Sequence, residues 1–125
     1  MRKSTATLIL IFLPMRLLAQ DSIFDGIYSL LVPEQHAYAT AQVRGEEAVI
    51  ILLTGELWEP YVGVVDGNVL TASGVTSVVG VDIRLSVTFT SPSIVDITID
   101  YCEPVTTALV CTYTAGTVLH GLKVF

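Results

Sequence analysis

Apolar and polar side chains alternate along most of the chain, and this period of two restricts the fold more than any other feature. The pattern is clearest over residues 79–90, where one face carries Val79, Val81, Ile83, Leu85, Val87 and Phe89. After a break at Ser91-Pro92-Ser93 it resumes, with a second apolar face expected at Val95, Ile97, Ile99 and Tyr101. Two such neighbouring segments predict antiparallel β-strands with one face in a core and one in water.

The same pattern predicts further strands, separated by short turn sequences. They are expected over residues 26–32, 36–44, 48–54, 58–65, 69–73, 109–113 and 118–125. Asp66-Gly67 predicts a two-residue hairpin turn, and Thr114-Ala115-Gly116 predicts another hairpin. The sequence therefore predicts a single-domain, all-β antiparallel meander of about eight to nine strands. Such a sheet has to close as a small barrel or fold over as a sandwich to protect its edges.

One segment is apolar on both faces: residues 48–53, Ala-Val-Ile-Ile-Leu-Leu. We expect a central strand here, covered on both sides or packed against a partner chain. A strand of this composition is also prone to aggregate. Glu46, Glu47 and Glu56 flank it, and we interpret them as charges that oppose aggregation rather than as catalytic groups.

The N-terminal segment has the layout of a secretory signal peptide. Arg2 and Lys3 precede an apolar stretch, and Leu17 and Ala19 occupy the −3 and −1 positions before Gln20. The apolar stretch is short for a transmembrane helix, although an uncleaved membrane anchor is the alternative. We therefore expect a signal peptide over residues 1–19, one all-β domain over residues 20–125, and a periplasmic or extracellular location.

Removal of that segment makes the chain strongly acidic. Three basic residues would remain (Arg44, Arg84 and Lys123) against twelve acidic ones, a net charge of −9. Such a chain repels phosphate backbones and anionic membrane surfaces, so nucleic acid is excluded as a partner.

The only two cysteines, Cys102 and Cys111, are close in sequence. In an oxidising compartment this spacing predicts a disulfide across the base of a hairpin or loop. A metal site is the alternative, but there is no C-x-x-C motif, and His36 and His120 lack ligand spacing. We expect neither a metal nor a cofactor.

The motifs of catalysis are missing from the sequence, which contains no G-x-S-x-G motif. His120 is expected in the last strand, as a rim residue rather than a base. Asp96 and Asp100, with Asp82 on a neighbouring strand, are carboxylates that could cooperate, but alternate polar positions on a wet strand are usually solvated. We therefore expect no enzymatic activity.

Trp58-Glu59-Pro60-Tyr61 is the most distinctive local sequence, and Trp58 is the only tryptophan. Trp58 and Tyr61 are the candidate binding residues, because a rigid aromatic pair lines pockets and anchors interfaces. The competing interpretation is that Trp58 plugs one end of a barrel core.

Two short resemblances bear on the fold and role. Gly26-Ile27-Tyr28 resembles the Gly-x-Trp opening of lipocalin-type barrels, which implies an antiparallel barrel. The chain is also similar in size, expected compartment and disulfide use to small exported lysozyme inhibitors, with Ser73-Gly74 as a partial match to their loop motif.

The function predicted from these features is that of an exported, non-enzymatic module with a binding or structural role. The alternatives are an inhibitor of an exported hydrolase that acts through a protruding loop, and a subunit of a cell-surface or extracellular assembly. The expected partner is a protein or a small apolar ligand, and a homo-oligomer is a further alternative. An apolar cavity would favour the small ligand, and a filled core would favour the protein.

The exported chain is predicted to begin at Gln20 or within a few residues of it, because signal peptidases cleave after small residues such as Ala19. Intact-mass measurement of the exported form tests this. A mass that retains Arg2, Lys3 and the apolar stretch would contradict it.

Overall fold

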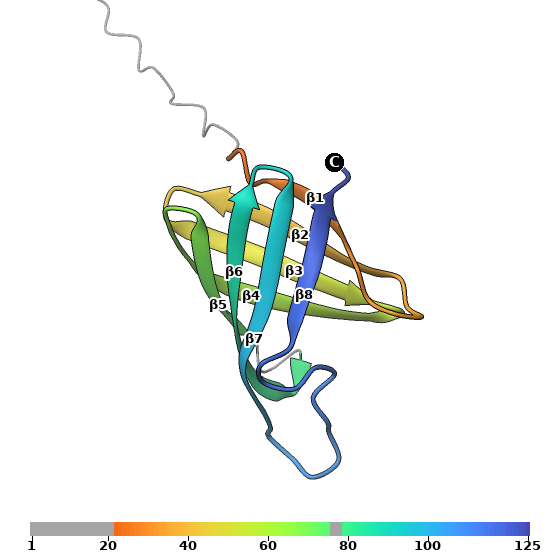
Figure 1. Ribbon diagram of the computed structural model, residues 1–125. Helices are drawn as coiled ribbons and strands as arrows, with labels where there is room; N and C mark the ends of the chain where they lie inside the picture. The colour runs from red at the N-terminus through yellow and green to blue at the C-terminus, as the bar shows by residue number, and fades with distance from the viewer. Residues whose placement is uncertain (1–21, 76–78) are drawn as a thin grey trace, which may run out of the picture.

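The computed structural model describes residues 22–75 and 79–125, which form a closed antiparallel barrel (Figure 1). Its eight strands are β1 (Gly26–Leu30), β2 (Ala37–Arg44), β3 (Glu47–Thr54), β4 (Leu57–Asp66), β5 (Val69–Gly74), β6 (Val81–Ser91), β7 (Ile94–Pro104) and β8 (Val118–Lys123). Each strand pairs with the next, and β8 pairs back with β1. The predicted all-β meander is confirmed, and it closes as a barrel rather than a sandwich. This is also the fold that the resemblance to lipocalin-type barrels implies.

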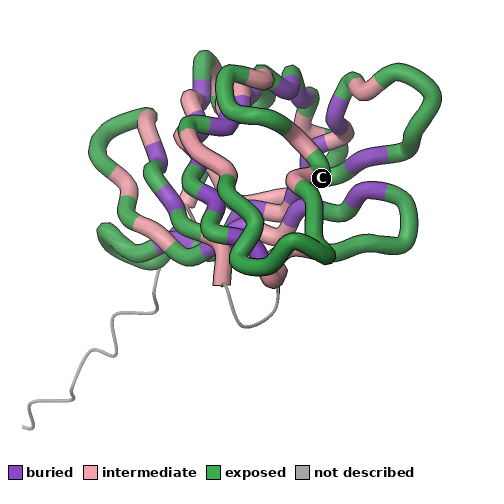
Figure 2. Tube along the Cα trace, turned by 90° about the horizontal axis from the view of Figure 1, so that it is seen from below, coloured by how far each residue is buried: buried purple, intermediate pink, exposed green. Residues whose placement is uncertain are grey.

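Large apolar side chains fill the interior of the barrel. Those that are almost fully buried include Tyr28, Ile50, Leu52, Tyr61, Leu70, Leu85, Ile97 and Ile99. β2 contributes the small residues Ala37, Ala39 and Ala41, which leave room for the larger side chains opposite. Buried and exposed residues alternate along the strands (Figure 2), as the sequence pattern predicts. An eight-stranded barrel is just wide enough for side chains to fill it, and here they do.

The strand predicted over residues 109–113 is wrong. These residues belong to the connection between β7 and β8, which pair directly with each other from Ile94↔Leu122 to Thr98↔Val118. In a closed barrel both strands already have two neighbours, so a ninth strand has no partner. The turn predicted at Thr114-Ala115-Gly116 is present, closed by a bond from the Thr117 amide to the Thr114 carbonyl at 3.1 Å, but it does not join two strands as a hairpin would, because only β8 follows it and no strand precedes it.

A β-bulge in β7 changes the predicted facing of its last residues. Arg84 pairs with Tyr101 and Leu85 pairs with Ile99, which leaves Asp100 as the extra residue. Beyond the bulge the alternation is shifted by one position. Tyr101, predicted on the apolar face, therefore lies outside with the Arg84 guanidinium 4.5 Å from its ring centre. Cys102 instead packs against the core.

The disulfide between Cys102 and Cys111 is confirmed, with their Cα atoms 6.2 Å apart. It ties the end of β7 to the long connection before β8, which projects from one end of the barrel (Figure 1). The predicted signal peptide and its cleavage site lie outside the described residues. Among the residues that are described, no helix is long and apolar enough to cross a membrane.

Replacing both Cys102 and Cys111 by Ser is predicted to lower the free energy of unfolding by about 2–4 kcal/mol, because the short loop is no longer closed in the unfolded chain. Urea unfolding of the variant and of the reduced wild type should agree. Thiol titration of the denatured, unreduced protein should find no free cysteine. Two free thiols, or a dimer that separates on reduction, would contradict the prediction.

Candidate interaction surface

The outside of the barrel differs sharply between its two halves. Over β6, β7 and β8 it is mostly polar and internally bonded, and its exposed apolar side chains are Ile94, Val118 and Leu122. The Ser86 hydroxyl donates to the Asp100 carboxylate at 2.5 Å, and His120 Nδ1 lies 2.6 Å from Asp96 Oδ1. These side chains satisfy one another across neighbouring strands, as expected for the wet face of a sheet.

Over β3 and β4, together with Tyr38 of β2, the outside is apolar. We call this surface the outer apolar face, and it consists of Tyr38, Val49, Ile51, Leu53, Trp58, Val62 and Val64. The strand register aligns its members in rows: Tyr38, Leu53 and Trp58 form one row, and Val49 and Val62 share another. Trp58 is 57% exposed, Val62 54% and Val64 56%. Contiguous apolar patches of this kind are unusual on monomeric proteins and mark interaction sites.

The sequence of β3 explains half of this surface. Ala48, Ile50 and Leu52 point into the barrel, and the residues between them, Val49, Ile51 and Leu53, point outward. The expectation that this chain covers the strand on both sides is wrong for the described residues, since Val49 and Leu53 remain exposed. Packing against a partner chain is the part of the expectation that stays open. Val62 and Val64 were not predicted to belong to a surface. Both point outward from β4, in alternation with the inward positions Tyr61, Gly63 and Val65.

The two candidate binding residues, Trp58 and Tyr61, lie on opposite sides of β4. Trp58 points outward, so the interpretation that it plugs the barrel core is wrong. Tyr61 is fully buried and takes that place, and its hydroxyl donates to Glu59 Oε2 at 3.1 Å. Burial, together with the neighbouring Glu59 carboxylate, raises the pKa of Tyr61 well above its usual value. Tyr61 is therefore a neutral hydrogen-bond donor of the core, and only Trp58 is accessible to a partner.

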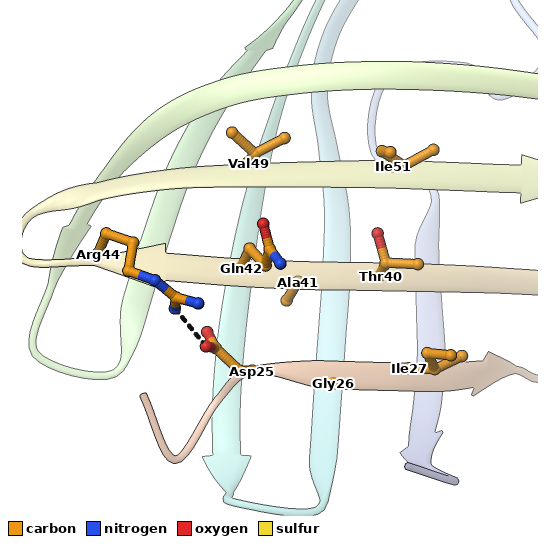
Figure 3. A pocket seen from close by; sticks show the side chains of 9 residues that line it. All are labelled: Asp25, Gly26, Ile27, Thr40, Ala41, Gln42, Arg44, Val49 and Ile51. Carbon is orange, nitrogen blue, oxygen red and sulfur yellow. Dashed lines mark hydrogen bonds and ion pairs between the residues drawn. The ribbon is translucent and has the colours of Figure 1, made fainter. Parts of the chain in front are cut away.

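A shallow hollow of about 520 Å³ adjoins the outer apolar face over β1, β2 and β3 (Figure 3). Ile27 lies on one side of it and Val49 and Ile51 on the other, with Thr40 and Gln42 between them. A second hollow of about 650 Å³ begins at Val62 and Val64 and extends over β5 and β6 to Asp100 and Tyr101 of β7. The outer apolar face is therefore bordered by a hollow on each side.

An ion pair closes one end of the first hollow. Arg44 Nη1 donates to Asp25 Oδ2 at 2.5 Å, and the Val43 amide donates to Asp25 Oδ1 at 2.6 Å. Partial burial raises the pKa of Asp25, but the bonds from Arg44 and Val43 outweigh it and hold that pKa below its usual value of 3.8. Asp25 thereby fixes the segment before β1 to the end of β2.

Four exposed carboxylates border the outer apolar face. We call them the acidic rim: Glu46, Glu47, Glu56 and Asp66. Glu47 is paired in register with Val64, and Glu46 and Asp66 lie at the same end of the barrel. Glu56 lies at the opposite end, in the turn before Trp58. The face therefore has negative charge at both ends.

The candidate catalytic groups do not assemble into one site. His36 precedes β2, whereas His120 is on β8 and is 64% exposed at its side chain. Asp96 is engaged by His120 and Asp100 by Ser86, while Asp82 lies near Arg84. Among the described residues, no three His, Cys, Asp or Glu side chains are grouped to hold a metal ion.

No protein-family model, curated protein or solved structure matches the chain. The similarities to lipocalin-type barrels and to exported lysozyme inhibitors thus stay resemblances of short motifs and general properties.

Asp25→Asn is predicted to lower the free energy of unfolding at neutral pH by about 1–2 kcal/mol, because a charge-assisted bond to Arg44 is lost. The sign of the pH dependence follows from the lowered pKa. Asp25 stabilises the fold above its unfolded pKa, and this contribution disappears as the pH falls through the lower folded pKa.

Urea unfolding at neutral pH and near pH 3 measures this difference. The difference in the free energy of unfolding between wild type and Asp25→Asn should be smaller near pH 3 than at neutral pH. Glu56→Gln, which removes one exposed turn carboxylate, should change stability little at either pH. A gap that stays constant across the pH range would show that Asp25 acts by packing alone.

Proposed function

We propose that this protein is an exported, non-enzymatic barrel that binds another protein through its outer apolar face. The observation that carries the proposal is the placement of apolar side chains on both sides of β3. The inner set fills the barrel, and the outer set, with Trp58 and Val62 beside it, remains exposed. Exposed aromatic and aliphatic side chains in rows are the residues that dominate binding energy at protein interfaces.

The filled interior supports a protein partner over a small apolar ligand. Tyr28, Tyr61 and Leu70 occupy the space that a ligand would need inside an eight-stranded barrel. Full burial of an exposed Val or Leu side chain contributes about 1.5–3 kcal/mol, and the side chains of this face are about half exposed, so several of them together would supply a stable interface. A subunit role in a surface assembly would use the same face.

A non-enzymatic role is supported by the surroundings of the His120–Asp96 pair. Both side chains lie on the polar half of the barrel, at 64% and 35% exposure. A base in that position is surrounded by water, whereas catalytic pairs are usually desolvated and face a nucleophile. An exported location is supported by the Cys102–Cys111 disulfide, which persists in oxidising compartments.

A second candidate, the inhibitor of an exported hydrolase, is favoured by the connection between β7 and β8. It projects from the barrel, the disulfide holds its base, and Val110 is 83% exposed. Leu109 packs over Gly80, where an added Cβ would lie 2.6 Å from Leu109 Cδ1. A pre-ordered loop of this kind loses little entropy on entering a cleft.

A photo-crosslinking residue in place of Val62 is predicted to join one defined protein of the exported fraction. The same residue in place of Leu122, which is exposed on β8, should not. The crosslinked protein is then purified and titrated against the wild-type barrel, with Trp58 fluorescence as the signal.

In that titration Val62→Thr should weaken binding at least tenfold, since it places a hydroxyl in an apolar interface. Leu122→Ser, matched in exposure, should leave the affinity unchanged. If Val62→Thr binds as wild type does, the outer apolar face is not the interface. Loss of affinity in Val110→Ser instead would favour the loop and the inhibitor role.

A further inference from the structure

The charges around the outer apolar face define which partner fits it, and this inference rests on the proposed function. We infer that the occupant is a segment of another protein in which apolar side chains are accompanied by lysine or arginine. The apolar side chains would cover Val49, Trp58 and Val62. The basic side chains would lie against the acidic rim.

The position of the rim carries the argument. Glu47 is paired in register with Val64 on β4 and with Arg44 on β2, so a partner that covers Val64 would also meet the Glu47 carboxylate. Glu46 and Asp66 add charge at this end, and Glu56 adds charge at the other. An apolar partner without basic groups would bring these carboxylates toward a neutral surface and lose part of their hydration. A basic partner replaces the lost hydration by ion pairs.

A second copy of this chain fits the face poorly. Carboxylates lie at both ends of the face, so a copy turned either way brings carboxylates against carboxylates. The basic residue at its border, Arg44, already bonds Asp25 and the Val43 carbonyl. Arg84 lies over Tyr101, and Lys123 donates to the Ile23 carbonyl. Like charges facing each other across an interface are unfavourable, so the charge pattern selects a different chain.

The position of Trp58 makes the inference measurable. It is the only tryptophan, and it lies in the face with more than half of its surface in water. Its emission moves to shorter wavelength when an apolar side chain covers it. Three short peptides serve as probes: alternating Leu and Lys, alternating Leu and Ser, and alternating Leu and Glu.

At low ionic strength the Leu-Lys peptide is expected to shift the Trp58 emission and to bind roughly tenfold or more tightly than the Leu-Ser peptide. The Leu-Glu peptide should bind least. Raising the salt concentration should weaken Leu-Lys binding and leave Leu-Ser binding nearly unchanged, because salt screens exposed ion pairs. This comparison uses only the wild-type protein.

Two double variants test which carboxylates attract the Leu-Lys peptide. Glu47→Gln with Asp66→Asn should weaken the Leu-Lys complex roughly three- to tenfold and leave the Leu-Ser complex unchanged. Asp66 is the last residue of β4 and pairs with Val69, so Asp66→Asn leaves the turn residues Gly67 and Asn68 unchanged. Asp82→Asn with Glu103→Gln removes the same number of charges from the polar half and should change neither complex.

Each other outcome is informative. Equal affinity for Leu-Lys and Leu-Ser would overturn the charge selection and leave the apolar docking face standing. If the Trp58 emission shifts without any peptide, and the shift grows with protein concentration, a second copy of the chain occupies the face and the inference is overturned. If none of the peptides moves the Trp58 emission, both the inference and the proposed function fail.

Discussion

The rest of the structure depends on the pairing of β1 with β8, which closes the sheet. It is a short seam: the paired residues are Tyr28↔Lys123, Ser29↔Leu122 and Leu30↔Gly121. Gly121 leaves room for the β1 side chain opposite it, because a Cβ at this position would lie 2.9 Å from Leu30 Cδ2. The Ile27 amide extends the seam by donating to the Phe125 carbonyl at 3.0 Å. Without the pairing of β1 with β8, these two strands would present unpaired backbone groups to other chains.

Closure also determines what each side chain has to do. Inward residues must fill a fixed volume, so small residues on β2 are matched by tyrosines and leucines elsewhere in the barrel. Outward residues are free of that requirement, and their chemistry reflects solvent and partners alone. The contrast between the mostly polar half with internal bonds and the exposed outer apolar face therefore supports the proposed binding role, because the barrel does not need that face to be apolar in order to fold.

Much of the fold could be predicted from the sequence because a period of two is a direct consequence of strand geometry. The predicted facing of side chains was wrong where one extra residue in β7 shifted the alternation of inward and outward positions. The extra residue at Asp100 moves Tyr101 outward and Cys102 inward, and no local signal marks it. The segment over residues 109–113 has the composition of a strand, but strand formation depends on a free neighbour, which closure removes.

The candidate site was only partly predictable. Trp58 and Tyr61 stand three positions apart, so in one strand they face opposite sides, and their parity alone separates an accessible residue from a core residue. The apolar composition of β3 on both faces was visible in the sequence, but which side the chain leaves open was not. Asp25 and Arg44 are nineteen positions apart, and their pairing follows from the register of β1 and β2, not from any motif.

A binding surface of this kind needs both affinity for apolar side chains and selectivity for one partner, and the acidic rim bears on both. An exposed strand like β3 attracts any apolar surface, including that of another unfolded copy, and this attraction has no chemical selectivity. Charge at both ends supplies selectivity, because it is repulsive toward every acidic chain, this one included, and attractive toward a basic one. The glutamates that the sequence predicts to oppose aggregation would thus also determine which partner binds. In the proposed complex the same charges oppose association between copies and favour association with a chain of opposite charge.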